Sequence, residues 1–210
     1  MQRERPTRFK ILDAIKTDGP QPVRALARVL DITDVAVRQH LVALERDGLV
    51  QRQSVRRPLG RPQNVYQLTE AAQGHFPQRY DDLACDLLDE AREALGGLGL
   101  EKLLQARLES QVARHAPRMQ GKDAAARLQE LAAIQDENGF MATSDARQGE
   151  IVQRHCSICT AAQRCPELCE QELLLFERLL GARVERVEHR LRGDPVCRYR
   201  VVGFDAEAAS

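Results

Sequence analysis

Residues 7–69 carry the pattern that most restricts how this chain can fold. Apolar side chains at helical spacing predict a helix over residues 7–18 and a shorter one over 22–30. After a short turn, Thr33 can cap a third helix, which ends at Gly48. Two short helices joined by a tight turn, with the second longer and richer in polar groups, predict a helix-turn-helix motif.

Two strand-like runs, residues 49–55 and 64–69, follow the third helix and flank the basic loop RRPLGRPQ. They add a β-hairpin wing, so the prediction becomes a winged helix-turn-helix domain over residues 1–69. In such a domain the third helix enters the DNA major groove, where Arg reads guanine and Gln reads adenine, and arginines of a narrow wing suit the minor groove. The residues expected to contact DNA are Thr33, Val35, Arg38, Gln39 and His40 of the third helix and Arg56, Arg57, Arg61 and Gln63 of the wing.

The distribution of charge agrees with a polyanion as the partner of the N-terminal third. Residues 1–80 hold 14 Lys and Arg against 8 Asp and Glu, a net charge of +6 in a chain whose formal net charge is zero. Alone, such charges would indicate only a solvated surface, but here they coincide with the helix-turn-helix pattern. The start MQRERPTRFK lacks the apolar core of a signal peptide, and no run approaches the roughly 18 apolar residues of a membrane span. We therefore expect a cytoplasmic protein that binds double-stranded DNA and no membrane.

Residues 70–138 are expected to form long helices that link the domains and support dimerisation. The first helix is expected to begin at Glu70, with apolar side chains recurring at helical spacing from Tyr80 to Leu95 before a run of glycines interrupts it. Two further helices are expected before residue 138. Winged-helix regulators usually bind DNA as dimers. The apolar stripe is therefore expected to form the seam of a homodimer, or else to pack on the chain's own wing domain.

From residue 139 the pattern changes to short strands and one amphipathic helix. The runs FMATSD and EIVQRH surround a turn, a helix follows Pro166, and two strand-like runs come after it. These elements predict a small antiparallel sheet with a helix on one face, over residues 139–210. The whole chain is thus expected to be α+β and mostly helical, with central long helices between the winged domain and a C-terminal domain whose helix carries cysteines.

The cysteines are concentrated in this C-terminal region. Five of the six lie between His155 and Cys197. Four of these fall within fourteen residues, namely Cys156, Cys159, Cys165 and Cys169. In a reducing compartment, clustered thiols are better read as ligands of a soft metal or of an iron–sulfur cluster than as disulfides. Cys165 and Cys169 also lie near the expected start of a helix, an environment that favours thiolates.

A structural zinc site and a thiol redox pair are alternative uses of these cysteines. Four thiols can form a structural zinc site, which would leave a regulator that senses something else. The pair Cys156-x2-Cys159 also occurs in thiol redox enzymes, but there it begins a helix after a strand of a βαβ unit, whereas here it follows a hairpin. An Arg-rich wing would have no purpose in such an enzyme, and no catalytic constellation stands out, so we expect no enzyme. Cys85, alone on its helix, is expected to be a small buried hydrophobe.

Two sets of motifs carry a resemblance to known regulators. The phrase LxxLERDGLVxR…GRPxxxYxLT resembles winged helix-turn-helix proteins of the ArsR/DeoR-like kind. The segments HC-x12-C-E-x-E-L-x-x-F-E-x-x-L-G and G-D-x-x-C-x-Y resemble the C-terminal domain of SufR-type iron–sulfur-sensing repressors, so the likeness extends from the winged helix to Val202. It implies a [4Fe-4S] or [2Fe-2S] cluster on Cys156, Cys169 and Cys197 that gates binding to an operon for cluster assembly. Oxidants, nitric oxide or iron shortage would then remove the cluster and lower the affinity for the operator.

The resemblance leaves the fourth ligand of this cluster open. Cyanobacterial-type members have a further cysteine between the last two positions, whereas this chain has none there and Arg183 lies near that place. The alternatives remain open in this order: first Cys159 and His189, then His155 or Cys165, then a small exogenous thiol.

Overall fold

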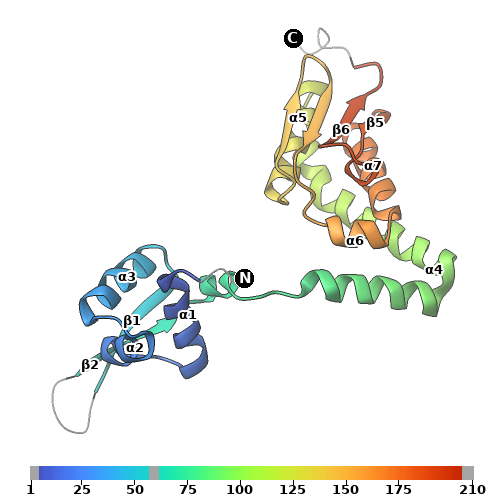
Figure 1. The fold of residues 1–210 in the computed structure, drawn as a ribbon. Helices are drawn as coiled ribbons and strands as arrows, with labels where there is room; N and C mark the ends of the chain where they lie inside the picture. Colours follow the sequence, from blue (N-terminus) through green and yellow to red (C-terminus); the bar gives the residue numbers. More distant parts are fainter. Residues whose placement is uncertain (1–4, 57–61, 205–210) are drawn as a thin grey trace. The chain divides into compact units, whose positions relative to one another are not determined.

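The computed structural model describes residues 5–56 and 62–204, which fall into two compact units on either side of the bond between Gln78 and Arg79 (Figure 1). Helices dominate both units, and each unit contains one antiparallel sheet. This confirms the expected α+β, mostly helical class. Over the part of the chain described, no helix is both long and apolar enough to cross a membrane.

The first unit consists of three helices, a two-stranded sheet and a short 3₁₀ helix. Its elements are α1 (Thr7–Asp18), α2 (Val23–Leu30), α3 (Asp34–Arg46), β1 (Val50–Val55), β2 (Gln63–Leu68) and η1 (Glu70–His75). Their order is the predicted helix, turn, helix and wing. The strands are antiparallel, in register from Val50 opposite Leu68 to Val55 opposite Gln63. The apolar sides of the three helices form one core.

The helix expected to begin at Glu70 begins ten residues later. Residues Glu70–His75 form the 3₁₀ helix η1, and Phe76 is extended, with φ −96° and ψ 157°. The cause is Pro77, which disfavours the helical conformation of the residue before it. The long helix α4 therefore runs from Tyr80 to Met119.

Helix α4 contains the break that its glycines predict. Gly96 has φ 68° and ψ 175°, a backbone conformation that is costly for any residue with a side chain, and it divides α4 into two helical parts. Pro117 lies within the last turn and does not end the helix, which continues to Met119. A proline so near the end removes few helical hydrogen bonds, which explains why the helix tolerates it.

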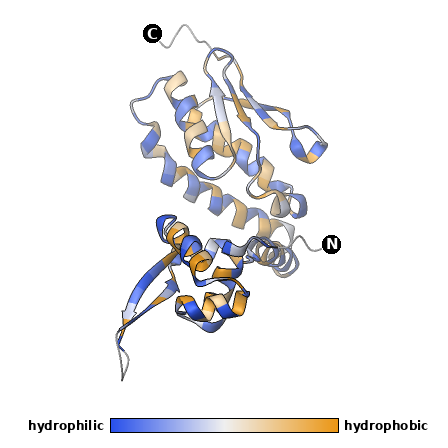
Figure 2. Ribbon diagram, turned by 60° about the vertical axis from the view of Figure 1, so that its left-hand side comes forward, coloured by the Kyte–Doolittle hydropathy of each residue, from blue (hydrophilic) through white to orange (hydrophobic). Residues whose placement is uncertain are grey.

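The second unit packs helices against one face of a four-stranded antiparallel sheet of order β3-β4-β6-β5. After α4 come α5 (Ala124–Glu137), β3 (Ala142–Asp145), β4 (Glu150–Gln153), α6 (Cys159–Arg164), α7 (Glu167–Leu180), β5 (Val184–Glu188), η2 (Arg190–Arg192) and β6 (Cys197–Val201). Figure 2 shows orange hydrophobic residues alternating with blue hydrophilic ones along these helices, as amphipathic helices require.

The core of the second unit joins regions that the sequence analysis treats as separate. Side chains of α4 and α5 lie in the same buried cluster as those of α7 and the sheet. At its centre, the rings of Phe176 and Tyr199 meet edge to face with centroids 4.7 Å apart. The expected helical region 70–138 and C-terminal domain 139–210 therefore share one compact unit from Arg79 onward.

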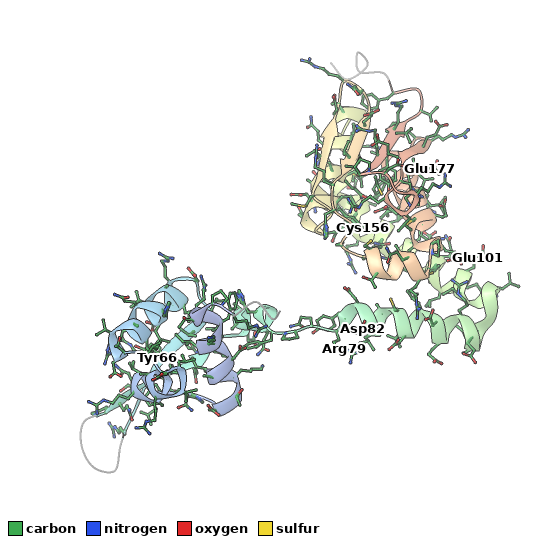
Figure 3. All side chains as sticks on the ribbon, in the orientation of Figure 1. Tyr66, Arg79, Asp82, Glu101, Cys156 and Glu177 are labelled. Atoms are coloured by element: carbon green, nitrogen blue, oxygen red, sulfur yellow. The ribbon has the colours of Figure 1, made fainter. Side chains whose placement is uncertain are left out.

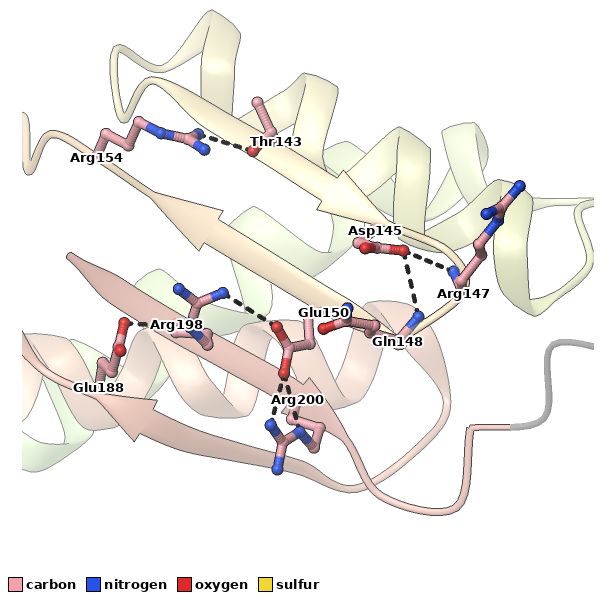
Figure 4. Close-up of polar contacts among 9 residues, drawn as sticks. All are labelled: Thr143, Asp145, Arg147, Gln148, Glu150, Arg154, Glu188, Arg198 and Arg200. Atoms are coloured by element: carbon pink, nitrogen blue, oxygen red, sulfur yellow. Dashed lines mark hydrogen bonds and ion pairs between the residues drawn. The ribbon is translucent and has the colours of Figure 1, made fainter.

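The opposite face of this sheet carries a buried carboxylate between arginines (Figure 4). Glu150 pairs with Arg200 across β4 and β6, and its side chain is 4% exposed. It accepts hydrogen bonds from Arg200 (2.7 and 3.0 Å) and from Arg198 (3.1 Å). Arg198 also donates to Glu188 on β5, so the ion pairs connect three strands.

We expect Glu150→Gln to make the free energy of unfolding of the second unit depend less on pH in the acidic range. Burial acts to raise the pKa of Glu150, but the hydrogen bonds from Arg200 and Arg198 outweigh it, and the pKa is lowered. A lowered pKa in the folded state gives stability that is fully present above the ordinary Glu pKa and is lost as pH falls through the lowered value. Denaturant unfolding at a series of acidic pH values measures this. Glu185→Gln, an exposed change on β5, should keep the slope of the unchanged protein, and an equal slope in Glu150→Gln would contradict the assignment.

Candidate nucleic-acid interface and candidate cluster site

The exposed face of α3 is the candidate nucleic-acid interface of the first unit. Val37, Leu41 and Leu44 are fully buried, which turns the opposite side of the helix outward. Val35 is 65% exposed on that side, and Arg38 and Gln39 are exposed with it. Neither Arg38 nor Gln39 has a hydrogen-bond or ion-pair partner among the described residues, so both are free to bind a ligand.

Three other residues of this region support or extend the face. Thr33 is the N-cap of α3, where its Oγ1 accepts a hydrogen bond from the Ala36 N–H (3.2 Å), so its role is to begin the helix. His40 is only partly exposed. Val42 is 66% exposed two turns after Val35, and the sequence analysis missed it. Its spacing from Val35 is the signal that would have found it, because residues seven apart share a helix face.

The wing is described only in part. Arg56 is exposed directly after β1, and Gln63 begins β2 opposite Val55. Arg57 and Arg61 lie outside the described residues. The two described residues therefore stand at the base of the wing tip, where the hairpin would bring side chains to a phosphate backbone.

The candidate cluster site lies at one end of the four-stranded sheet. Cys197 begins β6 and pairs with Gln153, the last residue of β4. Cys156 follows β4 by three residues and lies between the sheet and α6 (Figure 3). Cys169 lies in the first turn of α7, the helix that packs on this face. Three separate elements of the second unit thus carry Cys156, Cys169 and Cys197 at this end of the sheet.

The pKa shifts of these three thiols share one main cause and include interactions among the thiols. Burial is the main cause that raises the pKa of Cys156 to about 11 and that of Cys169 to about 12, and it also raises the pKa of Cys197. The charge of Cys197 acts on both other thiols, and that of Cys156 acts on Cys169. The helix N-terminus was expected to favour thiolates at Cys165 and Cys169. That expectation is wrong, because burial outweighs the helix dipole and the pKa of both thiols is raised.

Backbone N–H groups donate to two of the three sulfurs, and a guanidinium binds the backbone of the third cysteine. The Arg190 N–H donates to Cys197 Sγ (3.5 Å), and the Ile158 backbone donates to the thiol of Cys156. The Arg186 guanidinium donates to the carbonyl oxygen of Cys169 and lies 5.8 Å from the Tyr199 ring centroid. Hydrogen bonds to sulfur and nearby positive charge are features that stabilise and tune sulfur-ligated iron.

The other predicted ligands lie apart from this group to different degrees. Cys159 begins α6, and its charge is among the causes that raise the pKa of Cys156. Cys165 is 1% exposed in a separate cluster with Leu100, Leu104 and Leu168 of α4 and α7, where its thiol donates to Glu167 (3.3 Å). The His189 ring lies 3.4 Å from the Arg186 guanidinium.

Glu172 is a residue of this site that the sequence analysis missed. It lies one helical turn after Cys169 and accepts hydrogen bonds from the Tyr199 hydroxyl (2.5 Å) and the Gln153 side-chain amide (3.0 Å). Its charge contributes to the raised pKa of all three thiols, and burial raises its own pKa. The signal in the sequence was the spacing Cys169-x2-Glu172, which places both side chains on one face of α7.

The donor set at this end of the sheet consists of soft thiols. Within residues 5–56 and 62–204, no group of three or more His, Cys, Asp or Glu side chains is placed to hold one metal ion. The ligands of a cluster bind different iron atoms and need not converge on one point. Soft thiols with N–H donors to sulfur suit iron–sulfur chemistry.

Comparison with known proteins bears on the first unit. Residues 4–53 match the family model described as a helix-turn-helix domain. The N-terminal unit is a helix-turn-helix domain. Together with the wing and the free polar face of α3, this supports a DNA-binding transcriptional regulator. No curated protein matches the chain. Among solved structures, the crystal structure of Bacillus subtilis PadR in complex with operator DNA has a TM-score of 0.31 and 12% identity, over 84% of this chain and 99% of that chain.

Proposed function

We propose that this regulator is a homodimeric repressor whose affinity for its operator is set by an iron–sulfur cluster on Cys156, Cys169 and Cys197. The observation that carries the proposal is the approach of these three thiols at one end of a sheet, in a chain that begins with a helix-turn-helix domain. Genes for iron–sulfur cluster assembly are the proposed target. We assign the chain no catalytic activity.

The cysteines would connect elements that otherwise meet only through the core. Cys197 begins β6 and Cys169 belongs to the first turn of α7, so holding both sulfurs fixes this strand relative to this helix. The cluster would supply reactivity toward oxidants and nitric oxide and sensitivity to iron supply. Loss of the bond between the cluster and Cys156 would release the segment between β4 and α6, because Cys156 is the proposed ligand on that segment. The effect on DNA binding then depends on how differently the two states bind DNA.

Helix α4 connects this site to the proposed dimer seam. Its second part packs on α7 within the core, and its first part presents an apolar stripe. The stripe is formed by Tyr80, Leu83, Leu87 and Leu95, which are 72%, 53%, 61% and 57% exposed. Burial of such a stripe between two copies would stabilise a dimer. A change in the position of α7 would then be transmitted through α4 to the apolar stripe of the proposed dimer.

We expect Arg38→Ala to weaken operator binding about 10- to 100-fold, which corresponds to about 1–3 kcal/mol for one base-reading side chain. Duplexes selected from a random library by the unchanged protein provide the operator for anisotropy titrations. Arg56→Ala, which removes a charge at the wing base, should instead weaken binding to all sequences evenly and reduce the salt slope by about 1. If Arg38→Ala bound selected and random duplexes with the same ratio of affinities as the unchanged protein, α3 would not read the bases.

The function as a whole is tested by comparing loaded and stripped protein on that operator. Protein purified without oxygen should be brown and contain iron and sulfide, and stripping it should weaken operator binding by about 5- to 150-fold, the usual range of coupling between two sites. A colourless protein that holds zinc and binds the operator equally before and after chelation would support a structural zinc and refute the proposal.

A further inference from the structure

A cavity of about 170 Å³ lies within the second unit, between α4, α5 and α7. Its polar wall includes Arg107 of α4, Gln135 of α5 and Glu172 of α7. Phe140 and Leu175 also line it and supply apolar surface. An apolar cavity of about 150 Å³ can hold a benzene molecule, so the space here is large enough for a small organic molecule. The polar groups of the wall indicate the chemical class of that molecule.

The side-chain amide of Gln135 offers this cavity a buried hydrogen-bond donor. Gln135 is 3% exposed, and its Oε1 accepts a hydrogen bond from Gln153 Nε2 (3.3 Å). This contact distinguishes the oxygen of the amide from its nitrogen and leaves Nε2 as the end open to the cavity. Among the described residues, none accepts a hydrogen bond from Gln135 Nε2. Because an unpaired buried donor costs free energy, an acceptor on a ligand would be stabilising.

Two side chains of opposite charge border the cavity without forming an ion pair. The charges of Arg107 and Glu172 interact, but no hydrogen bond or ion pair joins them in the part of the chain described. Arg107 is exposed, so it stands where the cavity opens. Glu172 accepts from Gln153 at Oε1 (3.0 Å) and from Tyr199 at Oε2 (2.5 Å), which leaves one lone pair on each oxygen. Burial raises the pKa of Glu172, so a cation beside it would stabilise its charged form.

We propose that this cavity binds a small zwitterion, an α-amino acid with a short side chain. The carboxylate of the ligand would accept hydrogen bonds from the Arg107 guanidinium and from Gln135 Nε2, and charge-assisted bonds of this kind are strong. Its ammonium group would donate to the Glu172 carboxylate. Both charged groups of an α-amino acid are attached to one carbon, so they reach neighbouring parts of one wall. The short side chain would contact Phe140 and Leu175.

A ligand with a single charge would match this wall less well. A simple carboxylate would bring its charge toward Glu172, and a simple amine would bring its charge toward Arg107, so each would meet a like charge that it leaves unpaired. Ser157 and Ile158, in the segment between β4 and α6, also line the cavity. A bound amino acid would therefore hold this segment against α7. The inference requires no metal and does not depend on the proposed cluster.

Isothermal titration calorimetry of the full chain with L-alanine tests the proposal. Propionate is alanine without the ammonium group, and ethylamine is alanine without the carboxylate. L-alanine should bind, and each analogue should bind about 10- to 100-fold more weakly, because it leaves one charged group of the protein unpaired. Absence of L-alanine binding, or binding of propionate or ethylamine as tight as that of L-alanine, would overturn the proposal.

Variants of the two charged residues locate the binding site. Arg107→Gln should weaken L-alanine binding about tenfold or more and leave L-alanine and ethylamine with similar affinities. Glu172→Gln should leave L-alanine and propionate with similar affinities. Arg114→Gln, an exposed change on α4 outside the cavity lining, should bind all three compounds as the unchanged protein does. L-alanine binding unchanged in Arg107→Gln would contradict the site. This exposed substitution decides the question even if Glu172→Gln does not fold.

The outcomes also separate this inference from the proposed function. The titrations are made with protein whose iron and sulfide contents have been measured, before and after chelation. L-alanine binding by protein without iron supports the zwitterion site whatever becomes of the cluster. A brown, iron-loaded protein that binds no L-alanine, before or after chelation, overturns the zwitterion site and leaves the proposed regulator in place.

Discussion

The triple variant Cys156→Ser, Cys169→Ser, Cys197→Ser incorporates less than about a tenth of the iron and sulfide of the unchanged protein, and its operator affinity equals that of stripped protein. A serine hydroxyl is a much poorer ligand for iron than a thiolate, because iron–sulfur clusters are held by cysteine thiolates. Removing all three proposed thiolate ligands leaves no thiolate of the site to hold the cluster. Iron and sulfide analysis after anaerobic reconstitution measures the first effect, and anisotropy on the selected operator measures the second.

The two buried cysteines outside the site provide matched controls. Cys85→Ala removes a thiol that is 6% exposed, and Cys165→Ala removes one that is 1% exposed. The triple variant likewise removes thiols that are buried or partly buried. Both should keep full iron content, because Cys165 lies in a separate buried cluster and Cys85 lies in the first part of α4. Iron retained by the triple variant at the level of these controls would show that the metal is bound elsewhere.

The winged helix-turn-helix could be predicted because its information is local. Val37, Leu41 and Leu44 recur at helical spacing and are all fully buried, and Thr33 caps their helix as its side chain suggests. The end of the wing was predicted equally well, but the start of the helix after it was not. The helix was expected from Glu70, although its apolar stripe begins at Tyr80, and the local effect of Pro77 moves its start to Tyr80.

The candidate cluster site was predicted in part because motif resemblance includes long-range information that spacing lacks. Resemblance selected Cys156, Cys169 and Cys197, which lie just after β4, in the first turn of α7 and at the start of β6. Their joint use as ligands stays a prediction. Spacing alone placed Cys165 beside them, whereas the junction of α6 and α7 turns it toward α4. The spacing Cys169-x2-Glu172 places both residues on one face of α7, but the contacts of Glu172 with Gln153 and Tyr199 depend on the pairing of β4 with β6.

The raised pKa values of the thiols follow from burial in the folded chain. A helix N-terminus lowers the pKa of a thiol when the sulfur remains near water. In α7 the first turn is packed against the sheet, and desolvation there raises the pKa of Cys169 despite the dipole. No local sequence rule gives how deeply the first turn of α7 is buried. The direction of the pKa shift of Cys169 could therefore be obtained only from the fold.

Phe176→Ala should destabilise the second unit by about 3–5 kcal/mol, the usual cost of removing a buried aromatic ring. Phe176 is fully buried and meets the ring of Tyr199 edge to face, so its loss leaves a cavity under β6. The damage should extend to the cluster site, because Tyr199 is the residue whose hydroxyl holds Glu172. Iron content after reconstitution should therefore fall together with stability.

Hydrogen exchange of the amides in α7 and β6 measures the loss within the second unit without assuming that both units unfold together. Exchange from global opening should accelerate by about 140- to 3,700-fold, which is 3–5 kcal/mol at 1.4 kcal/mol for each factor of ten. Leu174→Ala, at a residue of the same helix that is 40% exposed, should accelerate exchange about tenfold or less. Similar acceleration in both variants would mean that the contact of Phe176 with Tyr199 does not anchor the sheet to α7. The cluster site would then have to be positioned by Cys169 and Glu172 without support from the core beneath them.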